Sequence, residues 1–117
     1  MSLTFKDDEN EKNPAGEKEM EQYKTAGQNR NLCFVQPNGE SLFLNYAYLV
    51  AGKFSPNDSS IVLAYTTHTV TLNGHNLDAL YDSIMNQRQR TIICIDKRYA
   101  ETMDETWPIV YEIIVVG

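Results

Sequence analysis

The chain has 117 residues, of which 42% are hydrophobic and 22% charged, and its formal net charge is −6. This size and composition are typical of one globular domain. The acidic balance disfavours nucleic acid and anionic membrane surfaces as partners, since both attract Lys and Arg, and no apolar run reaches the ~20 residues of a membrane span.

The first 30 residues differ from the rest of the chain. They carry dense alternating charge and few apolar side chains, which predicts a charged, flexible tail over residues 1–30 rather than part of the core. A short helix over 17–25 is an alternative for part of it, since Met20 and Tyr23 form a weak apolar stripe. We therefore expect a single domain over residues 31–117.

The domain is predicted to begin with two strands. Residues 32–35 form a short apolar strand, and Pro37-Asn38-Gly39 has the residues of a tight turn. A long strand over 41–54 follows, with apolar side chains on both of its faces. This pattern predicts burial on both sides for part of the strand.

Residues 60–72 are predicted to form a hairpin. Apolar residues occupy odd positions up to Tyr65 and even positions from Val70, so an uninterrupted strand would turn them to opposite faces. A turn at 66–69 resolves this conflict, and a single bulged strand is the alternative.

One amphipathic helix is predicted over residues 76–88. Its apolar side chains recur every three or four positions, at Leu77, Leu80, Tyr81, Ile84 and Met85. Asn76 is expected to cap the first amides, and Arg88 suits the helix end.

After the helix we expect a strand over 91–95 that is covered on both faces, a polar loop over 96–107 and a last strand over 109–116. The fold class is therefore α+β, with about six strands in the order ββββαββ. The sheet is expected to be mostly antiparallel and curved or partly closed, with the helix on one face or end.

No segment has a catalytic or metal-binding signature. His68 and His75 have no neighbouring ligands at zinc-site spacing, and Cys33 and Cys94 have apolar flanks typical of inert, buried thiols. Two such cysteines also favour reduced thiols and a cytoplasmic location. We expect no metal, no cofactor and, on balance, no enzymatic activity.

The residues before the helix are the best candidates for a ligand site. Asn73, Gly74, His75 and Asn76 precede the first turn, where free amides could hold a phosphate or a carboxylate. Capping by the Asn76 side chain would satisfy those amides without a ligand, and we prefer this interpretation.

Aromatic residues favour an interaction role over catalysis. Tyr99, Trp107 and Tyr111 are candidates for an interface, because Tyr and Trp often contact partners there. The leading hypothesis is a non-catalytic protein-interaction or structural module that binds a protein partner or a second copy of itself, since residues 109–116 are apolar on both faces. The alternatives are a small-ligand or anion binder at Gly74 and His75, and an acidic inhibitor of a basic partner.

Overall fold

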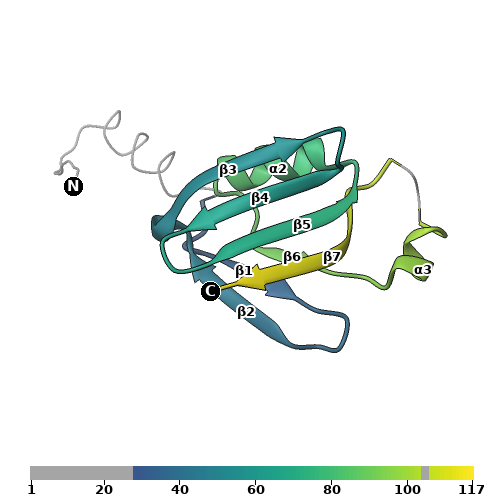
Figure 1. Ribbon diagram of the computed structural model, residues 1–117, viewed down its shortest axis with the longest axis horizontal. Helices are drawn as coiled ribbons and strands as arrows, with labels where there is room; N and C mark the ends of the chain where they lie inside the picture. Colours follow the sequence, from purple (N-terminus) through teal and green to yellow (C-terminus); the bar gives the residue numbers. More distant parts are fainter. Residues whose placement is uncertain (1–27, 104–105) are drawn as a thin grey trace, which may run out of the picture.

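The computed structural model describes residues 28–103 and 106–117 (Figure 1). The tail predicted over residues 1–30 lies outside this range up to residue 27. The described residues form β1 (Asn31–Val35), β2 (Ser41–Asn45), η1 (Tyr46–Tyr48), β3 (Leu49–Ser55), β4 (Ser60–Tyr65), β5 (Thr69–His75), α2 (Leu77–Met85), β6 (Thr91–Ile93), α3 (Lys97–Ala100) and β7 (Ile109–Val116). None of the helices in these ranges is long and apolar enough to cross a membrane.

The strands form two sheets. The small sheet has the order β2-β1-β6, with β1 parallel to β6, and the large sheet has the order β3-β4-β5-β7, antiparallel throughout. A single parallel bridge between Cys94 and Val110 joins the sheets, which are not closed into a barrel. The α+β class and the mostly antiparallel sheet are confirmed.

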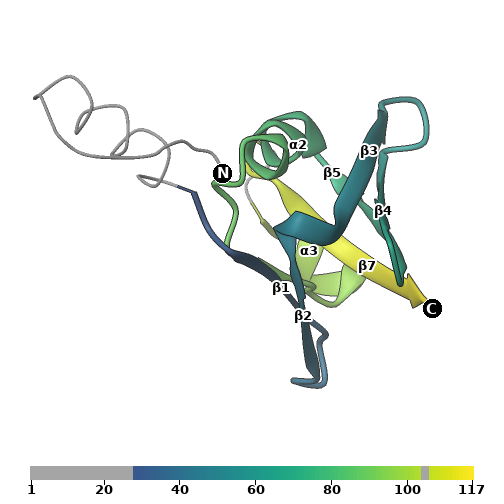
Figure 2. The ribbon, with the colours of Figure 1, turned by 90° about the vertical axis from the view of Figure 1, so that its left-hand side faces the viewer.

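The core lies between the two sheets and beneath α2. Side chains alternate inward along β4 and β5, where Leu63 and Leu72 are fully buried, and Phe34 faces them from β1. The turn between β4 and β5 switches the inward positions from odd to even numbers, which confirms the predicted hairpin. Figure 2 shows α2 at one end of the molecule, beside β3.

The predicted long strand over 41–54 is wrong, because η1 divides it between the two sheets. The Asn45 side chain accepts a hydrogen bond from the Ala47 amide at 2.8 Å, which bends the chain at this point. The buried Tyr46 donates its hydroxyl to the Gln89 carbonyl at 2.5 Å. With this break, the described residues form seven strands, five of them before α2.

The two-sided burial predicted for 41–54 and for 91–95 is also wrong. Phe43 is 64% exposed, Val50 71% and Ile93 62%. Phe43 and Ile93 lie on the outer face of the small sheet, where no second layer of described residues covers them, whereas Val50 lies at the irregular position of β3 on the side of α2. Apolar runs without alternation therefore mark exposed apolar faces here.

The helix and the loop also differ from their predicted bounds. α2 ends at Met85 rather than at 88, because Gln87 has a positive φ of 59° that no α-helix continues through. Residues 96–107 include the short helix α3, whose first turn is capped by the Asp96 side chain at 3.1 Å from the Arg98 amide.

Candidate functional site

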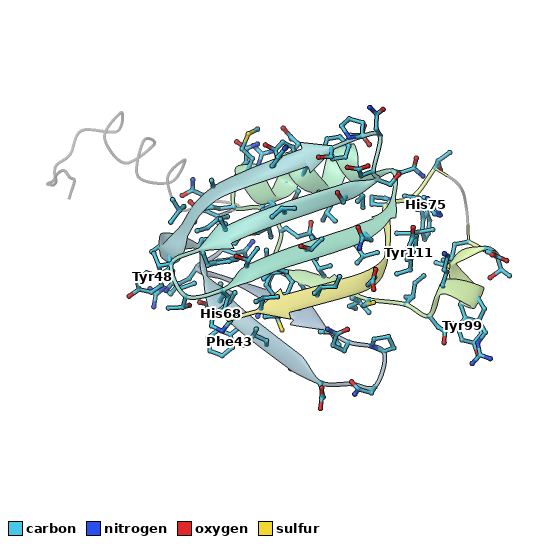
Figure 3. The ribbon with its side chains drawn as sticks, viewed as in Figure 1. Phe43, Tyr48, His68, His75, Tyr99 and Tyr111 are labelled. Carbon is cyan, nitrogen blue, oxygen red and sulfur yellow. The ribbon has the colours of Figure 1, made fainter. Side chains whose placement is uncertain are left out.

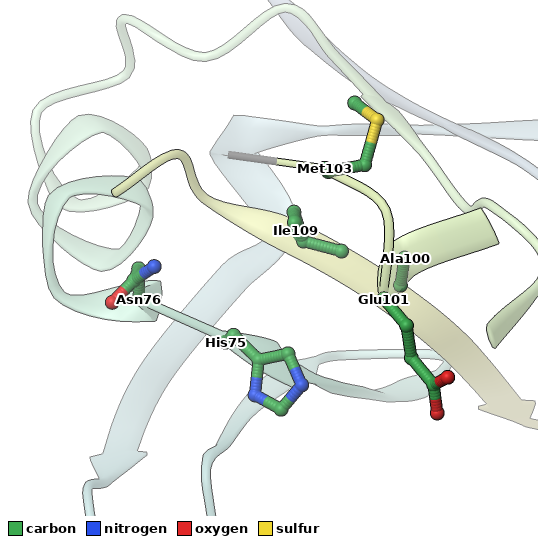
Figure 4. Close-up of a pocket in the computed structure, with 6 residues that line it drawn as sticks. All are labelled: His75, Asn76, Ala100, Glu101, Met103 and Ile109. Carbon is green, nitrogen blue, oxygen red and sulfur yellow. The ribbon is translucent and has the colours of Figure 1, made fainter. Parts of the chain in front are cut away.

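A cleft of about 430 Å³ lies where β5 passes into α2 and faces α3 (Figure 4). It is lined by side chains from segments far apart in the sequence, namely His75, Asn76, Ala100, Glu101, Met103 and Ile109. Ala100 and Ile109 are buried and provide an apolar floor, whereas His75, Asn76 and Glu101 are exposed and polar. The lining of the cleft is therefore mixed, with two apolar side chains at its floor and polar groups around them.

The backbone at the cleft is positioned by an irregularity between β5 and β7. The register of the two strands shifts between Asn73 and Gly74, so that Gly74 lies opposite Val110. A Cβ atom on Gly74 would lie 1.8 Å from the Ile109 carbonyl oxygen, so only glycine allows this approach. Gly74 thus has a structural role in bringing Ile109 to the cleft.

Asn76 does not cap α2 as predicted. Its backbone is left-handed, with φ 55° and ψ 46°, and its side chain makes no capping hydrogen bond. The side-chain amide nitrogen of Asn76 instead donates to the Trp107 carbonyl at 3.2 Å, which connects the start of α2 to the segment before β7. A capping geometry needs an extended Asn76 backbone, and the turn out of β5 prevents it.

Only part of the predicted ligand site is brought together. His75 and Asn76 line the cleft, but Asn73 donates to the Glu112 carboxylate at 2.9 Å on the outer face of the large sheet. Asn73 therefore stabilises the pairing of β5 with β7 and lies outside the cleft lining.

His75 connects the cleft to a stack of three side chains. Its ring meets the Tyr111 ring edge to face at 5.3 Å between centroids, and the Lys97 ammonium lies 5.1 Å from the Tyr111 centroid. Figure 3 shows His75 and Tyr111 side by side at the same end of the molecule. Such contacts orient the imidazole and the ammonium against the Tyr111 ring.

The other predicted interface residues lie at this end too. Trp107 and Tyr99 are each 59% exposed, and the Arg98 guanidinium lies 5.3 Å from the Tyr99 ring centroid. Tyr99 projects from α3 away from His75 and Tyr111 (Figure 3). The three predicted interface residues therefore surround α3 without forming one continuous cluster.

The cleft offers His75 and Glu101 as polar groups that could form hydrogen bonds with a bound group. Neither Cys33 nor Cys94 is among the side chains that line it. Burial raises the pKa of the Cys94 thiol, so it stays protonated. Within residues 28–103 and 106–117, no three His, Cys, Asp or Glu side chains are grouped to hold a metal ion.

Three of the six residues that line the cleft were not predicted from the sequence. Ala100, Glu101 and Met103 come from α3 and the residues after it, where we expected an irregular polar loop. The signal was Asp96 followed by four residues able to form one helical turn, a pattern too short to distinguish from a loop. Ile109 was assigned correctly to a strand, but its contact with α3 is a tertiary feature.

Comparison of the chain with protein-family models, with curated proteins and with solved structures gives no significant match. The roles of the cleft residues are therefore inferred from geometry alone.

Proposed function

We propose that this protein is a non-catalytic interaction module that binds a segment of a partner protein at the cleft facing α3. The observation that carries the proposal is the cleft itself, which has an apolar floor at Ala100 and Ile109 and polar groups around it. An apolar centre with a polar rim is the usual anatomy of a protein interface.

The side chains around the cleft support a protein partner. Met103 and Trp107 remain exposed beside it, and Met and Trp are enriched at interfaces. A single inserted apolar side chain could contact the floor while the partner backbone bonds to His75 or Asn76. The net charge of −6 favours a basic partner, in keeping with the alternative of an acidic inhibitor.

A small-ligand binder is the second candidate for the same cleft. It is favoured by the position of the cleft at the start of α2, where amides carry partial positive charge, and by its volume, which is within the range of about 300–1,000 Å³ for small-molecule sites. A carboxylate or phosphate group would suit that position.

Selection from a random peptide display library tests the proposal. We expect peptides with an apolar anchor to bind the wild type and to lose about tenfold or more in affinity against Met103→Glu, which places a charge beside the apolar floor. Tyr48→Ala is the matched control, because Tyr48 is exposed at 59% and lies at the opposite end of the molecule (Figure 3).

Peptides whose affinity is unchanged by Met103→Glu would contradict binding at the cleft. If no peptide is enriched but inorganic phosphate or acetate perturbs the backbone resonances of His75 and Asn76, the small-ligand alternative replaces the proposal.

A further inference from the structure

The two sheets meet at the Cys94–Val110 bridge on the side of β6 and β7, and their other edges, β2 and β3, differ in how they are protected. β3 is the edge of the large sheet and carries several features that oppose pairing with another strand. Its register is irregular between Leu49 and Ala51, it contains Lys53, and its Gly52 carbonyl accepts a hydrogen bond from the Tyr81 hydroxyl at 3.2 Å. Bulges, lysines and covered backbone groups are the usual protection of an edge.

β2, the edge of the small sheet, has none of these features among the described residues. Its sequence Ser-Leu-Phe-Leu-Asn contains no charge, proline or glycine, and its register with β1 is unbroken from Ser41 to Asn45. Phe43, at the centre of the strand, is 64% exposed. An uncharged, regular edge with an exposed aromatic residue favours the addition of another strand.

The backbone of Phe43 is directed toward this open edge. Its partner Cys33 donates its N–H away from β2, to the Arg90 carbonyl at 2.9 Å. Since both members of a non-hydrogen-bonded antiparallel pair point their backbone groups outward, the N–H and C=O of Phe43 point away from β1. The same alternation directs the N–H of Ser41 and of Asn45 to the edge.

We propose that β2 is a self-association site, at which the β2 strands of two copies pair antiparallel across a twofold axis at Phe43. This register uses the whole strand, since Ser41 of one copy then lies opposite Asn45 of the other. It places no like charges opposite each other, because β2 is uncharged. The strand is thus complementary to itself.

The neighbouring residues extend this complementarity. On the outer face of the small sheet, Phe43 lies beside Cys33, and Val35 lies beside Ile93, so the apolar surface continues from the edge across the sheet. Pairing would join the two small sheets into one and bring the two Phe43 rings together. The interface of one five-residue strand is smaller than the ~800 Å² per partner of a stable complex, so the dimer is weak and dissociates on dilution.

Sedimentation equilibrium over about 5–500 µM of full-length protein tests the proposal, since a weak dimer dissociates within this range. The mass of the wild type should rise from 13.4 kDa toward twice that value. Phe43→Lys should remove this rise, because two lysines would meet at the axis. Val50→Lys is the matched control on the other edge, with Val50 71% exposed, and should associate like the wild type.

Ser41→Pro provides a second variant that leaves the aromatic ring in place. It removes an N–H that points to the open edge and so should weaken association, while the bonds between β1 and β2 remain. Circular dichroism establishes that each variant is folded. A wild type that stays at 13.4 kDa at every concentration overturns the proposal, as does association that survives both Phe43→Lys and Ser41→Pro.

Discussion

The outer faces of the two sheets are both free of a second layer of described residues, but the sheets end in different edges. On the large sheet the outward positions of β5 are polar, whereas β7 places Ile114 and Val116 on the same face, 42% and 64% exposed. On the small sheet, Phe43 and Ile93 face outward. Apolar residues therefore lie on both outer faces. The sheets differ in that Phe43 lies on an uncharged, regular edge strand, whereas the edge strand β3 has an irregular register and carries Lys53.

The largest expected effect is a loss of stability when alanine replaces glycine. This loss should be larger at Gly74, in a tight contact of the large sheet, than at Gly39, in an open turn of the small sheet. Gly74→Ala should lower the free energy of unfolding by about 3 kcal/mol, because the new Cβ would overlap the Ile109 carbonyl. Gly39→Ala should cost only about 1–2 kcal/mol, from its φ of +92°, since nothing lies within 4 Å of the added atom.

Urea unfolding of both variants measures these energies. Equal losses would contradict the close approach of β5 and β7 that forms the floor of the cleft.

The next effect concerns alkaline pH and Tyr65, on β4 of the large sheet. Burial raises the pKa of Tyr65 to about 12, above the value of about 10 expected in the unfolded chain. The folded state therefore holds this proton more tightly. The contribution of the protonated Tyr65 hydroxyl to the free energy of unfolding is complete below about pH 10. Between about pH 10 and about pH 12 it should fall by about 1.4 kcal/mol per pH unit.

Unfolding measured at about pH 9 and about pH 11 tests this slope, with Tyr65→Phe as the reference. A slope that is the same in Tyr65→Phe would exclude Tyr65 as its cause.

The two buried tyrosine hydroxyls should respond differently to removal. Tyr46, which joins the sheets through η1, donates to the Gln89 carbonyl, so Tyr46→Phe should destabilise by about 1–2 kcal/mol. The Tyr65 hydroxyl has no hydrogen-bond partner among the described residues, so Tyr65→Phe should leave stability unchanged or raise it by about 1 kcal/mol. Thermal unfolding near neutral pH compares the stability of the two variants. A larger loss of stability in Tyr65→Phe than in Tyr46→Phe would contradict the assignment of the stabilising hydrogen bond to Tyr46.

The two cysteines should be alkylated at different rates. Cys94 is 4% exposed and burial raises its thiol pKa, whereas Cys33 is half-buried beside Phe43 on the outer face. The sequence predicts slow alkylation of both, but the structure places only Cys94 in the core. Mass spectrometry during iodoacetamide treatment should show Cys33 reacting first, and faster reaction at Cys94 would contradict its burial.

The sequence predicted correctly the elements whose position follows from the spacing of nearby apolar residues. The change from odd to even positions located the hairpin of β4 and β5, and the stripe at Leu77, Leu80 and Ile84 located α2. The break at η1 depends both on the local bond from the Ala47 amide to the Asn45 side chain and on Tyr46 reaching Gln89, which is 43 residues away. No local pattern encodes the second contact. Apolar residues such as Ile93 also look alike in sequence whether or not a second layer covers them.

The same limit applies to the cleft. His75 and Asn76 were identified because they stand between a strand and a helix, which is a local feature. Glu101 and Met103 reach the cleft only because α3 folds back against β7, and the sequence of 96–107 carries no periodic signal for that.

Amide hydrogen exchange at the two edges tests most directly whether β2, the edge of the small sheet, is a site of association while β3, the edge of the large sheet, is not. The Phe43 amide on β2 and the Gly52 amide on β3 both point outward, as their neighbouring backbone bonds show. We expect exchange at Phe43 to slow as the protein concentration rises, while exchange at Gly52 stays constant. Exchange at Phe43 that is independent of concentration, or a slowing that is equal at both amides, would contradict the account.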